Sequence, residues 1–197
     1  MPTRADEILH DVYRTLGIAP SDYNQIFDSI DDIVTQLADL NRFDTIPVGT
    51  TGTITERLCE AGLKSVVKDS YGKLPSQWKW VGDFYIEGTP FNIIISVKSF
   101  KAKERLMASG SGNILSPTVG FGLFDDPGEF NEERVRRYPF RAFLAIYVPQ
   151  ALYDQLESNV QNLTNMNGKA FIRSINFLRE DIKEALGQGE KIDITKV

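Results

Sequence analysis

Apolar side chains recur with a helical period in several parts of the chain. Residues 21–40 carry one such stripe, which predicts a helix with Ser21 as its N-cap. A shorter helix is predicted over Ala5–Leu16, ending at Gly17, and another over residues 53–62. After Pro149 the spacing favours one more helix, whose inward stripe comprises Leu152, Leu156, Val160 and Leu163. A final helix is predicted over Leu178–Leu186.

Alternation of apolar and polar residues predicts strands in the middle of the chain. Trp78–Glu87 and Phe91–Phe100 flank the turn residues Gly88-Thr89-Pro90, as in a hairpin. Phe140–Val148 and Lys169–Phe177 are predicted as further strands, whereas the glycine-rich stretch Ser109–Gly128 is predicted to be a long loop that contacts a ligand or partner. The resulting order predicts an α/β fold, in which helices flank a mixed central sheet.

Charge divides the 197-residue chain at a turn-rich junction, Asn41–Gly52. The net charge is −5, yet residues 1–47 carry 3 basic and 9 acidic side chains. Residues 48–197 carry the other 19 basic and 18 acidic ones, so this part is nearly neutral. We therefore predict an acidic helical appendage over residues 1–47, which could also form a dimer contact, and an α/β domain over residues 48–197.

Single copies of two residue types exclude several chemistries. Cys59 is the only cysteine, so an intramolecular disulfide and zinc sites built from several thiolates are excluded. His10 is the only histidine, so a metal site that needs two imidazoles is excluded. Catalytic Ser-His-Asp or Cys-His arrangements are not expected either. An enzyme built on this sequence would work through carboxylates, lysines or hydroxyls.

The apolar runs of the chain are too short to cross a bilayer, which needs about 20 apolar residues. The first residues lack the basic start and apolar block of a secretory signal. The sequence therefore predicts an intracellular protein located in the cytoplasm.

Two short stretches concentrate positive charge. Lys98–Arg105 holds four basic residues against the single acid Glu104, and Arg134–Arg141 holds four arginines and no acid. Such stretches can bind a polyanion even when the net charge is negative, because the local potential at the contact surface decides. The alternative is that both stretches are ordinary solvated faces.

One spacing carries candidate chemistry. Gly82-Asp83 is followed by twelve residues and then by Ser96-Val97-Lys98, and both segments fall on the predicted paired strands. This arrangement resembles the PD-(D/E)xK nuclease superfamily, to which many type II restriction endonucleases belong. The resemblance implies a restriction-endonuclease-like core of helix, three strands, helix and strand, which residues 53–177 match in order.

The resemblance also implies roles for individual residues. Asp83 would bind Mg²⁺, and Lys98 would orient or deprotonate a water molecule or stabilise the developing charge. Ser96 stands in the position of the second carboxylate, and Gly82 in that of the name-giving proline. Glu56 and Glu104 are the two candidates for the missing acid, both as a metal ligand and as a catalytic group.

Each of these residues also has a structural interpretation. Glu56 closes the sequence Thr53-Ile54-Thr55-Glu56, which fits a capping box at a helix start. Asp83 could be a hairpin aspartate, Lys98 a strand lysine extending to solvent, and Glu104 a helix-surface residue. A hydrolytic Ser96/Lys98 dyad is a further alternative, although mid-strand positions seldom provide an oxyanion pocket.

The nuclease interpretation predicts double-stranded DNA as partner, a prokaryotic source, and a homodimer, because cutting both strands of a duplex favours two sites. Candidate DNA contacts follow the catalytic strand or lie in the arginine stretch: Lys101, Lys103, Arg105, Ser109, Ser111, Asn113, Arg134, Arg136, Arg137 and Arg141. Two alternatives stay open. One is a DNA-binding or protein-interaction module on the same fold that has lost its catalytic acid, and the other is an unrelated interaction protein that uses its acidic helices.

Overall fold

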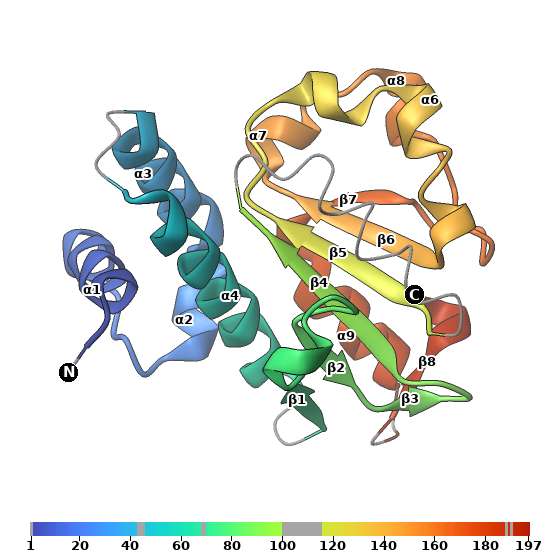
Figure 1. Ribbon diagram of the computed structural model, residues 1–197, viewed down its shortest axis with the longest axis horizontal. Coiled ribbons are helices and arrows are strands. Elements are labelled where there is room, and N and C mark those ends of the chain that lie inside the picture. Colours follow the sequence, from blue (N-terminus) through green and yellow to red (C-terminus); the bar gives the residue numbers. More distant parts are fainter. Residues whose placement is uncertain (1, 43–45, 68–69, 100–115, 188, 190) are drawn as a thin grey trace.

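A six-stranded sheet forms the centre of the molecule, as the computed structural model shows (Figure 1). The structure describes residues 2–42, 46–67, 70–99, 116–187, 189 and 191–197. In sheet order the strands are β1 (Tyr71–Lys73), β2 (Phe84–Ile86), β4 (Ile93–Lys98), β5 (Thr118–Gly122), β6 (Phe143–Val148) and β7 (Ile172–Ser174). The pairs β1–β2 and β2–β4 are antiparallel, and the other pairs are parallel. The predicted α/β class with a mixed, helix-flanked sheet is confirmed.

Side chains alternate between two apolar clusters on opposite faces of this sheet. Ile95 and Tyr147 belong to the larger cluster, which also contains residues of α9 (Leu178–Leu186). Ile146 and Val148 belong to the second cluster, beneath the short helices α6 (Glu132–Val135), α7 (Gln150–Tyr153) and α8 (Ser158–Gln161). Figure 1 shows these three helices beside β6 and β7, whereas α9 lies behind the sheet in that view.

Four helices precede the sheet. They are α1 (Arg4–Leu16), α2 (Tyr23–Asp28), α3 (Ile30–Arg42) and α4 (Val48–Lys64), and their buried residues join the larger apolar cluster. α1 ends as predicted, at Gly17 in the left-handed conformation with φ 68°. α4 contacts α1, α2, β4 and α9, so it links the N-terminal helices to the sheet.

The helix predicted over residues 21–40 is divided in two. Ser29 lies between α2 and α3, and its N–H donates to the Gln25 carbonyl while its own carbonyl accepts from Ile33. The N-cap is Asp22 and not Ser21, because the Asp22 carboxylate accepts the N–H groups of Asn24 and Gln25. The apolar stripe continues across the break, so the pattern could not reveal it.

α4 begins earlier than predicted and takes up residues 48–52 of the expected junction, while residues 41 and 42 belong to α3. It starts after Pro47 and continues through Gly49 and Gly52. The buried side chains of Ile54 and Leu58 give this segment a core-facing side that outweighs its glycines. The capping-box interpretation of Glu56 is therefore wrong, since this residue lies well inside the helix.

The largest difference concerns the predicted loop Ser109–Gly128, which contains the central strand β5. Its residues are all buried between β4 and β6. A Cβ on Gly122 would stand 2.4 Å from the Phe124 ring and 2.9 Å from the Lys98 carbonyl oxygen. Close packing thus requires glycine in this strand, although its glycines resemble those of a loop.

The other predicted elements are shorter than expected. Trp78 lies in the 3₁₀ helix η1 (Ser76–Trp78) and Trp80 in the following turn, so the first hairpin strand is confined to β2. Gly88 and Thr89, predicted as turn residues, form the short strand β3 (Gly88–Thr89), which pairs in parallel with β8 (Ile192–Asp193). The helix predicted after Pro149 is split into α7 and α8, and β7 passes into the 3₁₀ helix η4 (Ile175–Phe177). β6 begins at Phe143 and not at Phe140, which lies in the 3₁₀ helix η3 (Pro139–Arg141), whereas α9 has the predicted bounds.

Within the described ranges, no helix combines the length and the apolar character needed to span a membrane.

Candidate functional site

Three of the residues singled out in the sequence meet at one place. Asp83 directly precedes β2, Lys98 ends β4, and Glu56 lies in α4. The Lys98 Nζ stands 3.8 Å from Asp83 Oδ2. A fourth residue, Lys79, joins the group, because its Nζ lies 3.0 Å from Glu56 Oε1 and 4.0 Å from Asp83 Oδ1. Two carboxylates and two ammonium groups therefore form a continuous cluster.

The backbone of β4 fixes the position of Asp83. The Asp83 N–H donates to the Ile95 carbonyl at 2.8 Å, and its Oδ2 accepts the N–H of Val97 at 2.7 Å. Gly82 makes this approach possible, since a Cβ there would stand 2.3 Å from the Ile94 Cγ2 atom and 3.0 Å from the Ile95 carbonyl oxygen. Proline carries a Cβ as well, so close packing against β4 explains why glycine occupies this position.

Lys98 lies beside Asp83 because it ends β4, the strand that pairs with β2, and β2 begins directly after Asp83. Its Nζ donates to the Val97 carbonyl at 2.9 Å, and only 14% of its side chain is exposed. The ammonium group is therefore confined near the carboxylate and does not extend freely to solvent. This placement contradicts the interpretation of Lys98 as a strand lysine with a solvated head group.

Glu56 is brought to the cluster by Lys79, which the sequence pattern did not single out. Lys79 lies in the turn after η1, between two tryptophans. Hydrogen bonding to Glu56 raises the pKa of Lys79, so its ammonium form is favoured at this place. No periodicity or spacing in the sequence relates Lys79 to Glu56, because the loop and the helix meet only through the folding of the chain.

The pKa of Asp83 differs in direction from that of another largely buried carboxylate, Glu60, which lies on α4 one turn after Glu56. Their side chains are 11% and 12% exposed, so both are largely removed from water. Burial acts to raise the pKa of Glu60, but Lys73 at 2.9 Å, with Lys64 and Arg57 nearby, brings that pKa below its usual value. Glu60 is a well-compensated structural carboxylate.

Among the described residues, the ammonium groups nearest to the Asp83 carboxylate are those of Lys98 at 3.8 Å and Lys79 at 4.0 Å. Burial raises the pKa of Asp83 above the ordinary value, and Lys98 and the Val97 N–H only partly offset this effect. The negative charge of Glu56 acts in the same direction as burial. The carboxylate of Asp83 is thus held ionised at a cost, in a position where an additional cation would be favourable.

The other predicted site residues do not all join this cluster. Ser96 lies on β4 between Asp83 and Lys98 in space, but its side chain is completely buried in the sheet. Substrate therefore has no access to its hydroxyl in this structure. Glu104, the second candidate for the missing acid, lies outside the described residues. The same holds for the candidate DNA contacts Lys101, Lys103, Arg105, Ser109, Ser111 and Asn113.

The arginine stretch surrounds α6, and much of its charge is compensated. Arg136 pairs with Glu132 at 2.6 Å, and Arg137 pairs with Glu133, one helical turn earlier. Arg134 lies at the end of α6, and its Nη1 atom is buried. The acids that precede the stretch therefore lower its local positive potential, which its sequence alone does not suggest.

The carboxylates of Glu56 and Asp83 are hard oxygen donors, the type that Mg²⁺ prefers. The Lys79 ammonium lies between them, and this cation marks the space that both carboxylates face. No group of three or more His, Cys, Asp or Glu side chains suited to a metal occurs in the part of the chain that the structure describes. The donor set matches a magnesium ion that keeps several water ligands, since Mg²⁺ is commonly held by one or two carboxylates.

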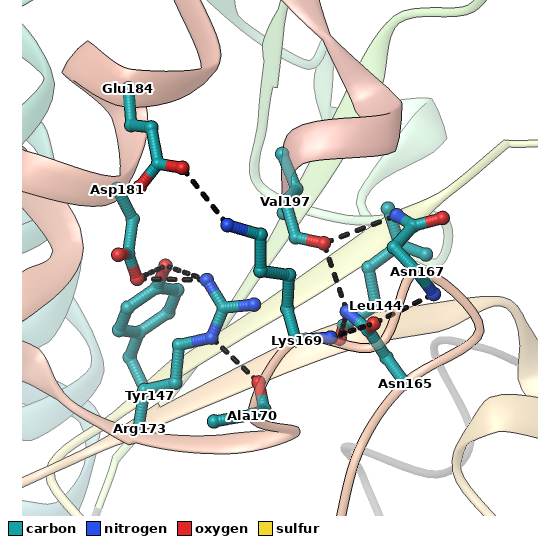
Figure 2. A network of polar contacts seen from close by, with 10 residues as sticks. All are labelled: Leu144, Tyr147, Asn165, Asn167, Lys169, Ala170, Arg173, Asp181, Glu184 and Val197. Carbon is teal, nitrogen blue, oxygen red and sulfur yellow. Dashed lines mark hydrogen bonds and ion pairs between the residues drawn. The ribbon is translucent and has the colours of Figure 1, made fainter.

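A second polar network lies at the other end of the sheet and involves none of the predicted residues (Figure 2). Arg173 on β7 pairs with Asp181 on α9 at 2.8 Å, and the hydroxyl of Tyr147 on β6 donates to the same carboxylate at 2.6 Å. Asn165 nearby donates to the carbonyls of Leu144 and Val197. These contacts connect β6, β7, α9 and the last residues of the chain, so the network holds the fold together.

Comparison of the chain with models of known protein families, with curated proteins and with solved structures finds no match.

Proposed function

We propose that this protein is a Mg²⁺-dependent endonuclease that hydrolyses phosphodiester bonds of DNA at specific sites, in the manner of the restriction-endonuclease-like members of the PD-(D/E)xK superfamily. The observation that carries the proposal is the meeting of Glu56, Asp83 and Lys98 from three separate elements. Of these, Asp83 and Lys98 are held by the backbone of one strand at 2.7 and 2.9 Å. A purely structural ion pair has no need of a second carboxylate from α4.

The proposed roles follow from the chemistry of each group. Asp83 and Glu56 would hold the magnesium ion, which neutralises phosphate charge and lowers the pKa of bound water. Lys98 would face the scissile phosphate and stabilise the negative charge that develops there. Lys79 would release Glu56 when the metal binds, because both cations use the same carboxylates.

DNA binding and dimerisation belong to the same proposal. Phosphates would be contacted by Lys101, Lys103 and Arg105 after β4, and further contacts would come from Ser109, Ser111 and Asn113. The candidate arginines are Arg134, Arg136, Arg137 and Arg141, and of these at least Arg136 and Arg137 would first have to leave their acidic partners. Two copies would cut the two strands of a duplex.

Cleavage of a long, mixed-sequence phage DNA tests the proposal. With Mg²⁺ we expect discrete fragments, and with EDTA none. Asp83→Asn and Lys98→Met should each reduce the rate by about 100-fold or more, because a group that stabilises transition-state charge is lost. Glu56→Gln and Glu104→Gln, tested side by side, identify the acid that completes the site.

Glu60→Gln is the matched control, since Glu60 lies on the same helix, is equally buried and pairs with Lys73. It should change the melting temperature without changing the dependence of cleavage on Mg²⁺. Intact DNA under every condition, with a folded protein, would overturn the proposal, as would cleavage by Asp83→Asn at the full rate.

A second candidate function is a DNA-binding or interaction module on the same fold without catalysis. It is favoured by the neutral balance of the cluster, in which Lys79 and Lys98 already face both carboxylates, and by the enclosure of Ser96. Binding of Mn²⁺ separates the two candidates. If the protein is a nuclease, it should bind Mn²⁺, and Asp83→Asn should abolish this binding. If it is a module without catalysis, Asp83→Asn should alter neither Mn²⁺ binding nor DNA affinity.

A further inference from the structure

Both tryptophans of the chain are exposed, and they lie on either side of Lys79. Trp78 is 48% exposed and Trp80 is 53% exposed, although tryptophan is on average highly buried in folded proteins. Their ring centroids are 6.0 Å apart with an interplanar angle of 31°. The two indoles thus form one aromatic surface, which we call the tryptophan pair.

The loop that carries the tryptophan pair is fixed to the candidate site at several points. The Leu74 N–H donates to the carbonyl of Asp83 at 2.9 Å, so the base of the loop is closed on the site itself. Within the loop, the backbone N–H of Trp78 donates to the Pro75 carbonyl, and the Trp78 carbonyl accepts from the Val81 N–H, both at 2.8 Å. Lys79 is directed to Glu56 and Asp83, and its neighbours in sequence therefore stay beside the cluster.

This juxtaposition limits what can occupy the tryptophan pair. The cluster offers ammonium groups and a cation position, which suit a phosphate, and the adjacent indole faces suit a planar apolar ring. A nucleotide carries both parts. Bases of an intact duplex are stacked on one another, however, so their faces are accessible to an indole only where a base is unpaired or turned out of the helix.

We propose that Trp78 and Trp80 form a stacking surface for unpaired nucleobases, which would hold a base that is turned out of the duplex next to the bond that the adjacent site cuts. The inference rests on the proposed function for the reaction, but the binding surface can be tested without catalysis. Stacking on an aromatic side chain depends little on base identity, so this surface would add affinity for unstacked bases, and the choice of site would come from other contacts.

Titration in EDTA isolates binding from cleavage. The probes are an oligothymidylate strand, a fully paired duplex, and the same duplex with a short unpaired stretch. Intrinsic fluorescence reports the contact directly, because the chain has only 2 tryptophans and both belong to the surface. We expect quenching by the single strand and by the interrupted duplex, with weaker quenching by the paired duplex.

Substitution then assigns the effect. Trp78→Ala and Trp80→Ala should each weaken binding of the two unpaired probes roughly five- to a hundred-fold, the range typical of one stacked base, and leave duplex affinity unchanged. Trp78→Phe and Trp80→Phe should retain most of the affinity. Phe177→Ala is the control, since Phe177 is 55% exposed and belongs to η4, which follows the edge strand β7 and lies outside the candidate DNA-contacting stretches.

The outcomes are distinguishable. Equal losses for paired and unpaired probes, or no loss at all, would overturn the stacking surface. A concentration-dependent dimer that Trp80→Ala abolishes, with unchanged DNA affinity, would overturn it in favour of a contact between copies. Tryptophan-dependent binding of unpaired DNA without any cleavage in Mg²⁺ would support the surface while the nuclease proposal fails.

Discussion

Asp83 is a largely buried carboxylate whose position is set by the backbone around it. Its backbone closes the loop that begins at Leu74, and its side chain accepts the Val97 N–H, so its position is fixed from two directions. Glu60, equally buried, is surrounded by basic groups and has a lowered pKa, whereas burial raises that of Asp83. The basic groups around Glu60 thus outweigh the effect of its burial, whereas those around Asp83 do not.

This contrast gives a pH-dependent prediction for Asp83→Asn in EDTA. The pKa of Asp83 is raised in the folded state by burial and by Glu56, against the effects of Lys98 and Lys79. The native state therefore binds this proton more tightly than the unfolded state, and ionisation of Asp83 lowers stability at neutral pH. The asparagine variant, which avoids this cost, should melt at a higher temperature than the wild type at pH 7.

The difference should shrink as the pH falls through the folded-state pKa of Asp83, because the wild-type carboxylate then becomes neutral as well. Thermal melting by circular dichroism between pH 7 and pH 4 measures this. A variant that melts at a lower temperature at pH 7, with a gap that is independent of pH, would show that the Asp83 carboxylate is an ordinary stabilising ion-pair partner.

At the scale of elements, glycines decide how closely the strands approach one another. Gly82 lets the segment before β2 lie against β4, and Gly122 in β5 lies against the Lys98 carbonyl. Both positions border the candidate site, so the geometry of Asp83 and Lys98 depends on missing side chains. Gly49 and Gly52 in α4, by contrast, have open space where a Cβ would stand.

Gly82→Ala should therefore destabilise the protein by about 1–3 kcal/mol, because the new methyl group overlaps Ile94 and the β4 backbone. It should also reduce cleavage, since Asp83 follows directly. The matched control is Gly52→Ala, which should raise stability by up to about 1 kcal/mol through helix propensity. Urea denaturation measures both, and a Gly82→Ala protein as stable and active as the wild type would contradict the close packing.

At the scale of the whole molecule, the N-terminal helices and the sheet share one apolar cluster. Polar contacts also join the N-terminal helices to the elements around the sheet: Asn176 of η4 donates to Asp31, and Arg179 of α9 pairs with Asp28. α4 contacts both α1 and β4, and so transmits the packing of one part to the other. The acidic segment 1–47 is thus attached through buried side chains as well as through surface charge.

Shared packing predicts a single cooperative unfolding transition. Leu37→Ala on α3 removes a fully buried side chain and should cost about 2–5 kcal/mol. Because both tryptophans lie beside the candidate site, their fluorescence reports on the α/β part of the molecule. The variant should lower the fluorescence midpoint in urea as much as the midpoint measured by circular dichroism.

Thr35→Ala, an exposed change on the same helix, is the control and should leave both midpoints nearly unchanged. A fluorescence transition that Leu37→Ala does not move would indicate that the helices unfold independently of the sheet.

Local patterns in the sequence were sufficient for much of this protein. The hairpin pattern predicted that the segments carrying Asp83 and Lys98 lie on neighbouring, paired parts of the chain. Helical periodicity likewise predicted α1 and α9, and the order of elements predicted the α/β class. These features depend on contacts between residues close in sequence or on adjacent antiparallel strands.

Only the tertiary structure decided the rest. Glu56 has the sequence context of a helix cap, yet α4 begins several residues earlier and Lys79 draws its carboxylate to Asp83. Likewise β5, rich in glycine, is a buried central strand because both neighbouring strands approach it closely. Such contacts join segments far apart in the chain, and their free energy comes from close packing and charge pairing, which no local pattern encodes.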